Sequence, residues 1–582
     1  MALLFLTLGC SDDILEKYPL DSLVEETTFT SNRNFETFAW GFYEVFDGYN
    51  LSALNYEFRG DLICRGSGSQ TDPWLRQNVS IPAADSDWNS AYRRIRRVNI
   101  MLRNTDNGVL DELQKSHWEG VGRFFRAINY YGLLNKFGGV PWLGDEVLTD
   151  ESEALYAPRA SRDELAQHIL DDLLFAESHV QSSSNNNTID KSVVRALISR
   201  FGLFEGTWRK YHGLDNENQY LQASFDASTK LIADHPSLIE KYDLVFNSAS
   251  LAGEPGILLY KDYIFGELTH IQTSRHRNSA GNWDLTKKAV DKYLFTDGTP
   301  FHTNPNWETL EQDPYDEFRD RDRRLYIATV PPFRVVTSKN QDLEFTYHTN
   351  PKFREYLDFM ATYSDAAHKG TPTQNWAGFI VKQEPHFRRF NQGQGFNVTY
   401  TGYRIHKFYN NLNTGIQNQD FADAPIFRMG EVLVNHAEAA YELGLFTQDI
   451  ANVTINKLRD RGEVAALDIA NIVADPTKDD NVDTILWEIR RERAVELMAE
   501  GFRPDDLRRW KKFVEYGGQE KLGRWVVNSD YNNRLPIQGG AAEGYVSPFG
   551  VPPGVPEHYY LAPIPSGQIV LNPNIDPNPG WE

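Results

Sequence analysis

Residues 490–510 read R-R-E-R-A-V-E-L-M-A-E-G-F-R-P-D-D-L-R-R-W, a charged stretch that begins inside a helical apolar pattern. On a helical wheel, the apolar side chains of 485–500 gather on one face. The members of that face are Leu486, Trp487, Ile489, Ala494, Leu497 and Met498. Arg490 and Arg493 fall on the same face, and a buried guanidinium needs a partner. The stretch therefore predicts a buried helix whose arginines pair with carboxylates from elsewhere in the chain.

A second predicted helix, 427–442, carries such carboxylates at Glu431 and Glu438. The apolar residues on the same face are Phe427, Val434 and Tyr441. We expect the two helices to pack face to face, with Glu431 and Glu438 in structural ion pairs with Arg490 and Arg493. Pairs of this kind specify the register of two helices more than they stabilise the fold.

Helical periodicity also fills the region before residue 235. A pattern over 118–137 ends at Gly138, Gly139 and Pro141, which stop a helix. Ser161 followed by Glu164 predicts a capping box at the start of the next helix. Further helices are predicted at 191–210, 217–233, 451–462 and 482–500. Helices of this length, joined by short turns, predict a mainly α fold with a tetratricopeptide-like helical-hairpin scaffold.

Composition narrows the classes of function. The chain has 59 Lys plus Arg and 81 Asp plus Glu, so its net charge is −22. This balance repels phosphate backbones, and we expect no nucleic-acid partner. The sequence contains no G-x-S-x-G, H-E-x-x-H or P-loop motif. Its histidines are scattered, so we expect neither a metal site nor a cofactor.

The first ten residues resemble an export signal. Residues 2–9 read A-L-L-F-L-T-L-G and precede Cys10. Such a run is too short to span a bilayer, which takes about 20 residues, but it suits a secretory signal with a small residue at the cut. A cysteine after the cut predicts a bacterial lipoprotein, with a diacylglyceryl thioether and palmitate-like chains on Cys10. Several acyl chains hold a protein firmly to a membrane.

Ordered sequence blocks then resemble one family, the SusD/RagB surface glycan-binding lipoproteins of Bacteroidetes. The blocks are L-E-K-Y-P-L at 15–20, F-F-R-A-I-N-Y-Y-G-L-L-N-K-F-G-G-V-P at 124–141, D-K-Y-L-F-T-D-G-T-P at 291–300, R-D-R-D-R-R-L at 319–325, D-A-P-I-F-R-M-G-E-V-L-V-N-H-A-E-A at 423–439, and the 490–510 stretch. The resemblance implies a helical scaffold with one face of ligand-binding loops. It also implies an outer-membrane, cell-surface location and a partner, a SusC-like TonB-dependent transporter over which the protein sits.

On this basis we divide the chain into four parts. These are a signal peptide at 1–9, an N-terminal helical SusD-like part at 10–234, a loop-rich insertion at 235–424 and a C-terminal RagB/SusD-like part at 425–582. The insertion is rich in Gly, Pro, Asn and Asp, and its aromatic residues argue against disorder. It is expected to form the ligand face.

Ligand contacts are expected from aromatic rings in loops, because sugars stack their C–H faces on such rings. Tryptophans with polar or Gly and Pro neighbours are the candidates, and those in the early and middle regions gain weight from the resemblance. They are Trp74, Trp283 and Trp376. Candidate hydrogen-bonding companions are Arg65, Asp72 and Asn282. By contrast, the alternating charges of 319–324 favour a solvated, salt-bridged surface.

Two other classes of function stay open. Glu431 and Glu438 are seven residues apart, about 10 Å along a helix, and inverting glycosidases separate their carboxyl groups by about 6.5–9.5 Å. A glycoside hydrolase would need such a pair at a cleft, without arginine partners. A protein-binding helical-repeat scaffold would instead bury its loop tryptophans. The favoured interpretation is non-catalytic glycan capture and delivery.

Overall fold

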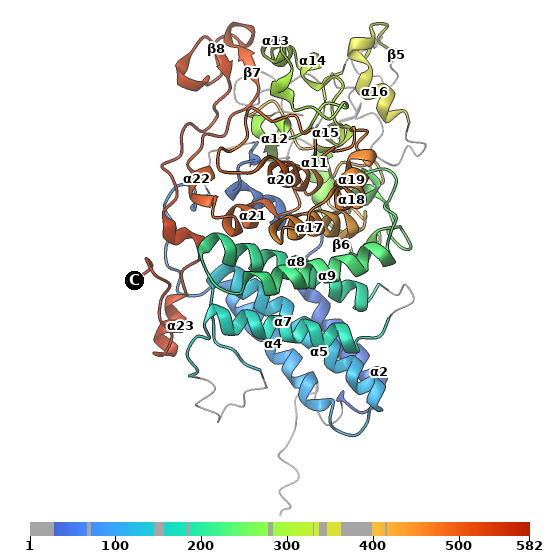
Figure 1. Ribbon diagram of the computed structural model, residues 1–582, viewed down its shortest axis with the longest axis vertical. Helices are drawn as coiled ribbons and strands as arrows, with labels where there is room; N and C mark the ends of the chain where they lie inside the picture. Colours follow the sequence, from blue (N-terminus) through green and yellow to red (C-terminus); the bar gives the residue numbers. More distant parts are fainter. Residues whose placement is uncertain are drawn as a thin grey trace, which may run out of the picture.

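The computed structural model describes residues 28–66, 72–144, 156–182, 187–277, 283–329, 331–333, 335–336, 346–362, 399–413 and 416–582. Within these ranges the chain is mainly helical (Figure 1). The predicted ligand contacts Asn282 and Trp376 and the predicted lipidation site Cys10 lie outside the described residues.

One half of the molecule is a stack of long antiparallel helices, in the lower part of Figure 1. Its helices are α2 (Asn32–Trp40), α4 (Ser86–Asn104), α5 (Glu112–Phe137), α7 (Arg162–His179), α8 (Lys191–His212) and α9 (Glu217–Asp234). From α4 onward, each helix packs on the next along the chain. This arrangement confirms the predicted helical hairpins.

Local signals set the ends of these helices. Ser161 and Glu164 form the predicted capping box, in which each side chain bonds the other's backbone N–H. Helix α5 ends at Phe137, where Gly138 takes a φ of 76° that other residues rarely adopt. Gly202 lets α8 approach α9, since a Cβ there would lie 2.5 Å from the carbonyl oxygen of Tyr220.

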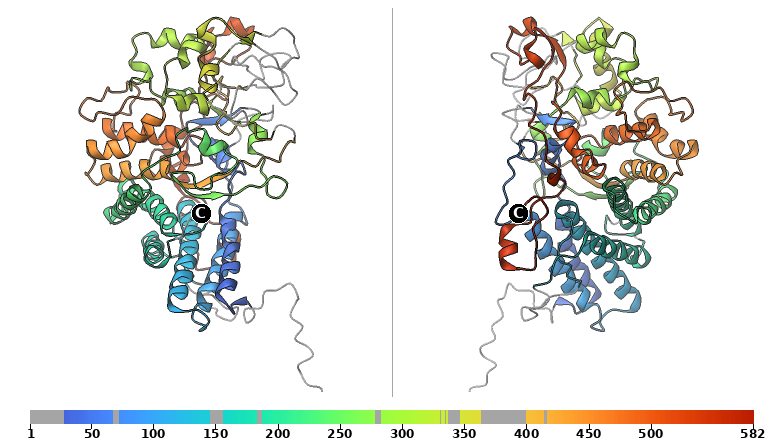
Figure 2. Two further views of the ribbon diagram at one scale, coloured as in Figure 1. Left: turned by 90° about the vertical axis from the view of Figure 1, so that its right-hand side faces the viewer. Right: turned by 60° about the vertical axis from the view of Figure 1, so that its left-hand side comes forward.

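The C-terminal helices lie against this stack. They are α17 (Met429–Glu442), α18 (Gln448–Val453), α19 (Ile455–Arg461), α20 (Thr484–Glu496), α21 (Arg503–Arg509), α22 (Phe513–Gly517) and α23 (Ser566–Leu571). Figure 2 shows the helices of 429–496 continuing the layer begun by α8 and α9, and α17 packs on both. The predicted helix from residue 427 begins two residues later, because Ala424–Arg428 forms strand β6 and pairs with β2.

The other half is built from short elements, as expected for the insertion. Its strands form antiparallel pairs: β1 (Ile63–Arg65) with β3 (Trp283–Leu285), β2 (Ile257–Lys261) with β6, β4 (Val335–Val336) with β5 (Thr346–Tyr347), and β7 (Trp525–Val527) with β8 (Glu543–Tyr545). The short α-helices are α3 (Ser52–Tyr56), α10 (Leu244–Asn247), α11 (Gln272–Arg277), α12 (Lys287–Asp291), α13 (Trp307–Gln312), α14 (Pro314–Phe318), α15 (Arg323–Ala328) and α16 (Glu355–Met360). The 3₁₀ turns of the described chain are η2 (Gly41–Val45), η3 (Glu57–Arg59), η4 (Phe301–Thr303), η5 (Pro351–Phe353), η6 (Asn528–Tyr531), η7 (Gln538–Gly540) and η8 (Glu557–Tyr560), of which η2 and η8 pack in the helical half.

Each half has its own large hydrophobic cluster. The first joins α2, α4, α5, α7, α8 and α9 to the C-terminal segment that includes Tyr559 and Trp581. The second lies under the short elements and includes Trp283, Tyr326 and Tyr403. Segments far apart in sequence, such as η3 and α21, meet at the junction of the two halves.

Candidate functional site

A cavity of about 420 Å³ opens at this junction, a volume within the usual range for small-molecule sites. Helices α4 and α5 form one side, and η3, α21 and η8 contribute the other. Its polar lining residues are Tyr56, Arg59, Asp87, Arg94, Asn129, Asn135, Lys136, Asp505 and Arg508. The lining is therefore rich in amide, carboxylate and cationic groups.

Asp505 organises one wall of the cavity. Its carboxylate accepts hydrogen bonds from the Tyr56 hydroxyl at 2.6 Å and from the Asn135 side-chain amide at 2.7 Å. Arg508 donates to Asp505 at 3.1 Å and to the Asn135 side-chain oxygen at 2.6 Å. Because each group is held by another, this wall presents donors and acceptors at fixed positions.

Aromatic rings form a second wall around Trp74, which is 8% exposed and lines the cavity. Its ring meets that of Tyr559 edge to face at 5.2 Å between centroids, and Tyr559 stacks on Trp581 at 5.0 Å. The Arg59 guanidinium lies 4.7 Å from the Trp74 ring centroid and 5.1 Å from that of Tyr56. A cation over two rings is a stable arrangement, and it leaves Arg59 as the more exposed group.

Asp72 shapes the loop that carries Trp74. Its side chain accepts the backbone N–H groups of Trp74 at 3.0 Å and Leu75 at 3.3 Å, and lies 3.6 Å from Arg59. Asp72 therefore stands next to the cavity, as a neighbour of two lining residues. Sequence reasoning placed it among the ligand contacts; the structure gives it this supporting position.

Arg65 and Trp283, predicted from distant parts of the sequence, face each other as partners in the β1–β3 pair. Trp283 is 4% exposed, and its indole N–H donates to Asn55 at 3.1 Å. The prediction of an exposed stacking ring at Trp283 is therefore wrong, because the strand pair turns this side chain into the second hydrophobic cluster. The Arg65 guanidinium lies over the Phe58 ring at 5.3 Å.

Sequence reasoning missed most of the cavity lining. Asp505 and Arg508 lie in the quoted 490–510 stretch, but its helical pattern pointed only to the scaffold. Tyr559 lies in the irregular C-terminal region, where no periodic pattern marks it. Arg59 follows Tyr56 by three residues, and only the fold brings this pair to Asn135.

The predicted ion pairs have different partners. Helices α17 and α20 do pack together as expected, but Glu431 pairs with Arg200 of α8 at 2.7 Å and Glu438 with Arg509 of α21 at 2.6 Å. Arg493 pairs with Asp506 at 2.8 Å, and Arg490 donates to the Tyr211 hydroxyl at 2.8 Å. The prediction was wrong because α8 and α21 also contact α17 and bring their own arginines.

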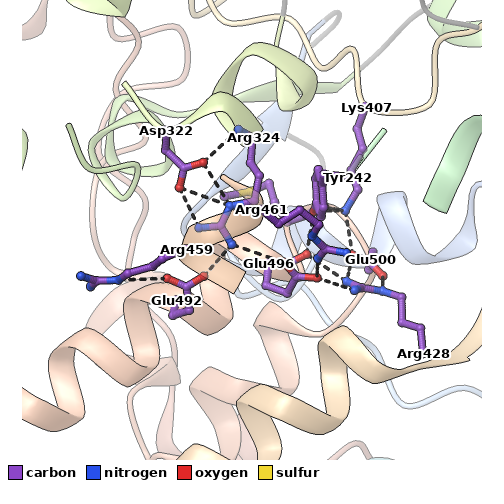
Figure 3. A network of polar contacts seen from close by, with 11 residues as sticks. Tyr242, Asp322, Arg324, Lys407, Arg428, Arg459, Arg461, Glu492, Glu496 and Glu500 are labelled. Carbon is purple, nitrogen blue, oxygen red and sulfur yellow. Dashed lines mark hydrogen bonds and ion pairs between the residues drawn. The ribbon is translucent and has the colours of Figure 1, made fainter. Parts of the chain in front are cut away.

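Three of the six charges of 319–324 are also placed differently from the prediction. Arg321, Asp322 and Arg324 are buried, each at most 2% exposed. Arg324 pairs with Asp322 at 2.7 Å and with Glu492 at 2.5 Å, within the network of Figure 3. Glu496, a turn further along α20, accepts from Arg428 at 2.5 Å. This half of the run is therefore part of a buried ionic core, because carboxylates of α20 face it. The other half, Arg319, Asp320 and Arg323, is partly or fully exposed, as predicted.

Two models of known protein families match this chain. A family model described as the SusD family matches residues 262–581, more than half of the 582-residue chain. The chain belongs to the SusD family. A second model, described as "Starch-binding associating with outer membrane", matches residues 65–203.

Curated relatives extend the SusD similarity over the whole length. SusD-like protein P38 of Formosa agariphila is 24% identical over 88% of this chain and 90% of its own length. SusD-like protein P2 of the same organism is 23% identical over 100% of this chain and 98% of its own length.

Solved SusD-like structures share the fold. A SusD-like carbohydrate-binding protein from Bacteroides fragilis superposes with a TM-score of 0.68, at 19% identity, covering 94% of this chain and 100% of its own. A laminarin-binding SusD-like protein gives a TM-score of 0.54 at 16% identity, covering 95% and 100%. Across the ranges that the structure describes, we find no helix with the length and apolarity needed to cross a membrane.

Proposed function

We propose that this SusD-family chain is a cell-surface lipoprotein that captures a glycan and delivers it to a SusC-like TonB-dependent transporter without cleaving it. Support comes from family membership, from a second family model whose description names starch binding and the outer membrane, and from relatives whose names state carbohydrate or laminarin binding. The observation that carries the proposal is the cavity between the two halves, which combines an aromatic wall with a fixed polar wall.

The polar wall suits a sugar. Hydroxyl groups pair with amides, carboxylates and guanidinium groups, which Asn135, Asp505 and Arg59 provide at the cavity. Trp74 backs the cavity beneath Arg59 and is only 8% exposed, so the polar groups carry most of the proposed contact. We assign Asn282 and Trp376 to the same ligand on the strength of the sequence alone.

The non-catalytic part of the proposal is supported by the state of the suspected carboxylates. Glu431 is 3% exposed and Glu438 is 0% exposed, and each is held by an arginine through both carboxylate oxygens. A glycosidase needs one carboxyl group that can donate a proton and another that can reach the sugar or a water. Glu438 is held ionised instead: burial alone would raise its pKa, but the charge and hydrogen bonds of Arg509 outweigh burial and lower the pKa to about 2.

The function is tested by binding measurements against α-glucans, β-glucans, fructans, mucin glycans and plant-wall polysaccharides. We expect a Kd between about 1 μM and 1 mM for the retained glycan, since tight binding would slow transfer. Arg59→Gln should weaken that binding about tenfold, because it removes a cation that is only partly buried. Arg93→Gln is the matched control, on an arginine that is 64% exposed and outside the cavity lining.

Unchanged binding in Arg59→Gln, with both variants folded, would remove the cavity from the proposal. Failure to retain any glycan in the panel would remove glycan capture itself. Release of reducing ends during incubation with the bound glycan would show catalysis and contradict the non-catalytic part.

A further inference from the structure

A second cavity, of about 300 Å³, lies between α12 and the segment that follows α22. It shares none of its lining with the first cavity. Four lysines line it: Lys287, Lys288, Lys292 and Lys521. This is a local concentration of positive charge on a chain whose net charge is −22.

Three of these lysines have partners in the wall. Lys287 is paired with Asp291, and Lys288 lies 3.1 Å from Asp61. Lys521 donates to the backbone carbonyls of Phe58 at 2.7 Å and Ile63 at 2.8 Å. Lys287 and Lys288 are therefore paired with carboxylates, and Lys521 is hydrogen-bonded to two carbonyl groups.

The carboxylates of the lining are equally occupied. Asp61 also receives Arg503 at 2.7 Å, and Asp291 holds Lys287. The third, Glu520, accepts hydrogen bonds from Gln538 and Ser547. None of these carboxylates forms an ion pair with the remaining lysine among the described contacts.

That remaining lysine is Lys292, which is 7% exposed. Among the residues that the structure describes, its ammonium has no hydrogen-bond or ion-pair partner, and its contact is the Trp487 ring, with the centroid 3.9 Å away. Asp475, whose charge acts on Lys292, is held by Arg491 at 2.5 Å and accepts the Trp487 N–H at 3.1 Å. Burial, together with neighbouring cations such as Lys288, lowers the pKa of Lys292 to about 7.

We propose that this cavity binds a small oxyanion, the carboxylate or sulfate group of a solute or of a sugar acid, through the ammonium of Lys292. A buried cation without an anion is costly, and an incoming anion would remove that cost. Lys288 stands on the same wall, 31% exposed, but its charge is already paired with Asp61, so Lys292 is the lysine that would hold the anion. The volume has room for one sugar-acid residue as well as for a free anion.

The test is isothermal titration of the full-length protein with sodium acetate, sodium sulfate, glucuronate and glucose, at constant ionic strength in a low-chloride buffer. We expect one anion site and no heat from glucose. Lys292→Met should weaken the anion at least tenfold. Lys230→Met, on a lysine that is 48% exposed on α9 and distant from the cavity lining, should leave binding unchanged.

Folding does not confound this test, because removing an unpaired buried charge should leave the melting temperature equal or higher. Sulfate stabilises proteins generally. If melting temperatures are also compared, only the part of the sulfate-induced rise that is lost in Lys292→Met reports binding at this site. Saturation by glucuronate alone identifies a sugar acid; similar affinities for acetate and sulfate identify a free-anion site. No anion binding, or binding indifferent to Lys292→Met, overturns the proposal. Capture of neutral glycans by the first cavity should be unaffected by Lys292→Met, so the two proposals fail separately.

Discussion

The carboxylate of Glu438 on α17 forms a two-pronged ion pair with the guanidinium of Arg509 on α21, at 2.6 Å on both sides. The indole N–H of Trp510 donates to the same carboxylate at 2.6 Å. Both partners of the ion pair are fully buried, at 0% and 1% exposed. This contact ties α17 to α21, the helix whose Asp505 and Arg508 line the first cavity.

Breaking this ion pair should strongly lower the stability of the folded protein. Glu438→Gln removes the two-pronged partner of Arg509 and leaves this buried charge only Asp506, which lies 2.9 Å away and also pairs with Arg493. Removal of one partner of a buried ion pair costs about 3–5 kcal/mol. Denaturation in urea measures the loss. Glu463→Gln is the control, because Glu463 is 61% exposed in its pair with Arg323, and it should change stability by less than about 1 kcal/mol. Equal effects from both variants would show that the pair is not a structural tie.

The pH dependence of stability should carry a signature of Glu57. This side chain is 1% exposed, and burial raises its pKa to about 8. In an unfolded chain it ionises near about 4.3. Between these values the folded protein binds one more proton than the unfolded chain, so this group's contribution to stability falls as pH rises through that range.

Glu57→Gln should therefore flatten the decline of unfolding free energy between pH 5 and about 8. The measurement is urea denaturation of variant and parent at several pH values. Glu254→Gln, at an exposed position, should leave the slope of the parent. A slope unchanged by Glu57→Gln would mean that Glu57 ionises in the folded protein as it does in the unfolded chain.

Because α8 and α9 approach closely at Gly202, a larger residue at this position should lower the stability of the protein. In Gly202→Ala the new Cβ would lie 2.5 Å from the Tyr220 carbonyl oxygen and 2.9 Å from the Ser224 backbone nitrogen. Backbone atoms cannot move aside cheaply, so we expect a loss of about 1–3 kcal/mol. Thermal unfolding of the variant measures it.

The control is Gly132→Ala on α5, where a Cβ meets nothing within 4 Å. Alanine at a helix interior is favoured over glycine by about 0.5–1 kcal/mol, so this variant should gain stability. Loss of stability in both variants would mean that crowding at Gly202 is not the cause.

Features that depend on neighbours in sequence could be predicted from the sequence. The Ser161–Glu164 capping box and the end of α5 at Phe137 involve residues within a few positions of each other. The face-to-face packing of α17 and α20 also followed from apolar periodicity. The partners of the buried charges could not be predicted in this way, because Arg324 and Glu492 are 168 residues apart and no local pattern joins them.

The candidate site shows the same limit. Trp74, a candidate chosen for its polar and proline neighbours, lines the cavity but is only 8% exposed, and the wall that faces it is assembled from Tyr56, Asn135 and Asp505. Trp40 on α2 is 48% exposed although it lies in a helix, since α2 lies at the edge of the helical stack. Periodicity states which face of a helix is apolar but not whether another element covers it.

The two cysteines give a matched test of the lipid anchor. Cys64 is a buried free thiol, and burial together with nearby Asp284 raises its pKa, so it stays unreactive. Cys10 follows the apolar run of residues 2–9 and is the proposed site of acylation.

Cys10→Ser should therefore abolish incorporation of labelled palmitate in the bacterial host. It should also move the protein from the membrane fraction to the soluble fraction, since stable attachment takes more than one acyl chain. Cys64→Ser should keep both the label and the membrane location. Label that persists in Cys10→Ser would place the acyl chains elsewhere, and soluble protein in the unmodified chain would contradict anchoring altogether.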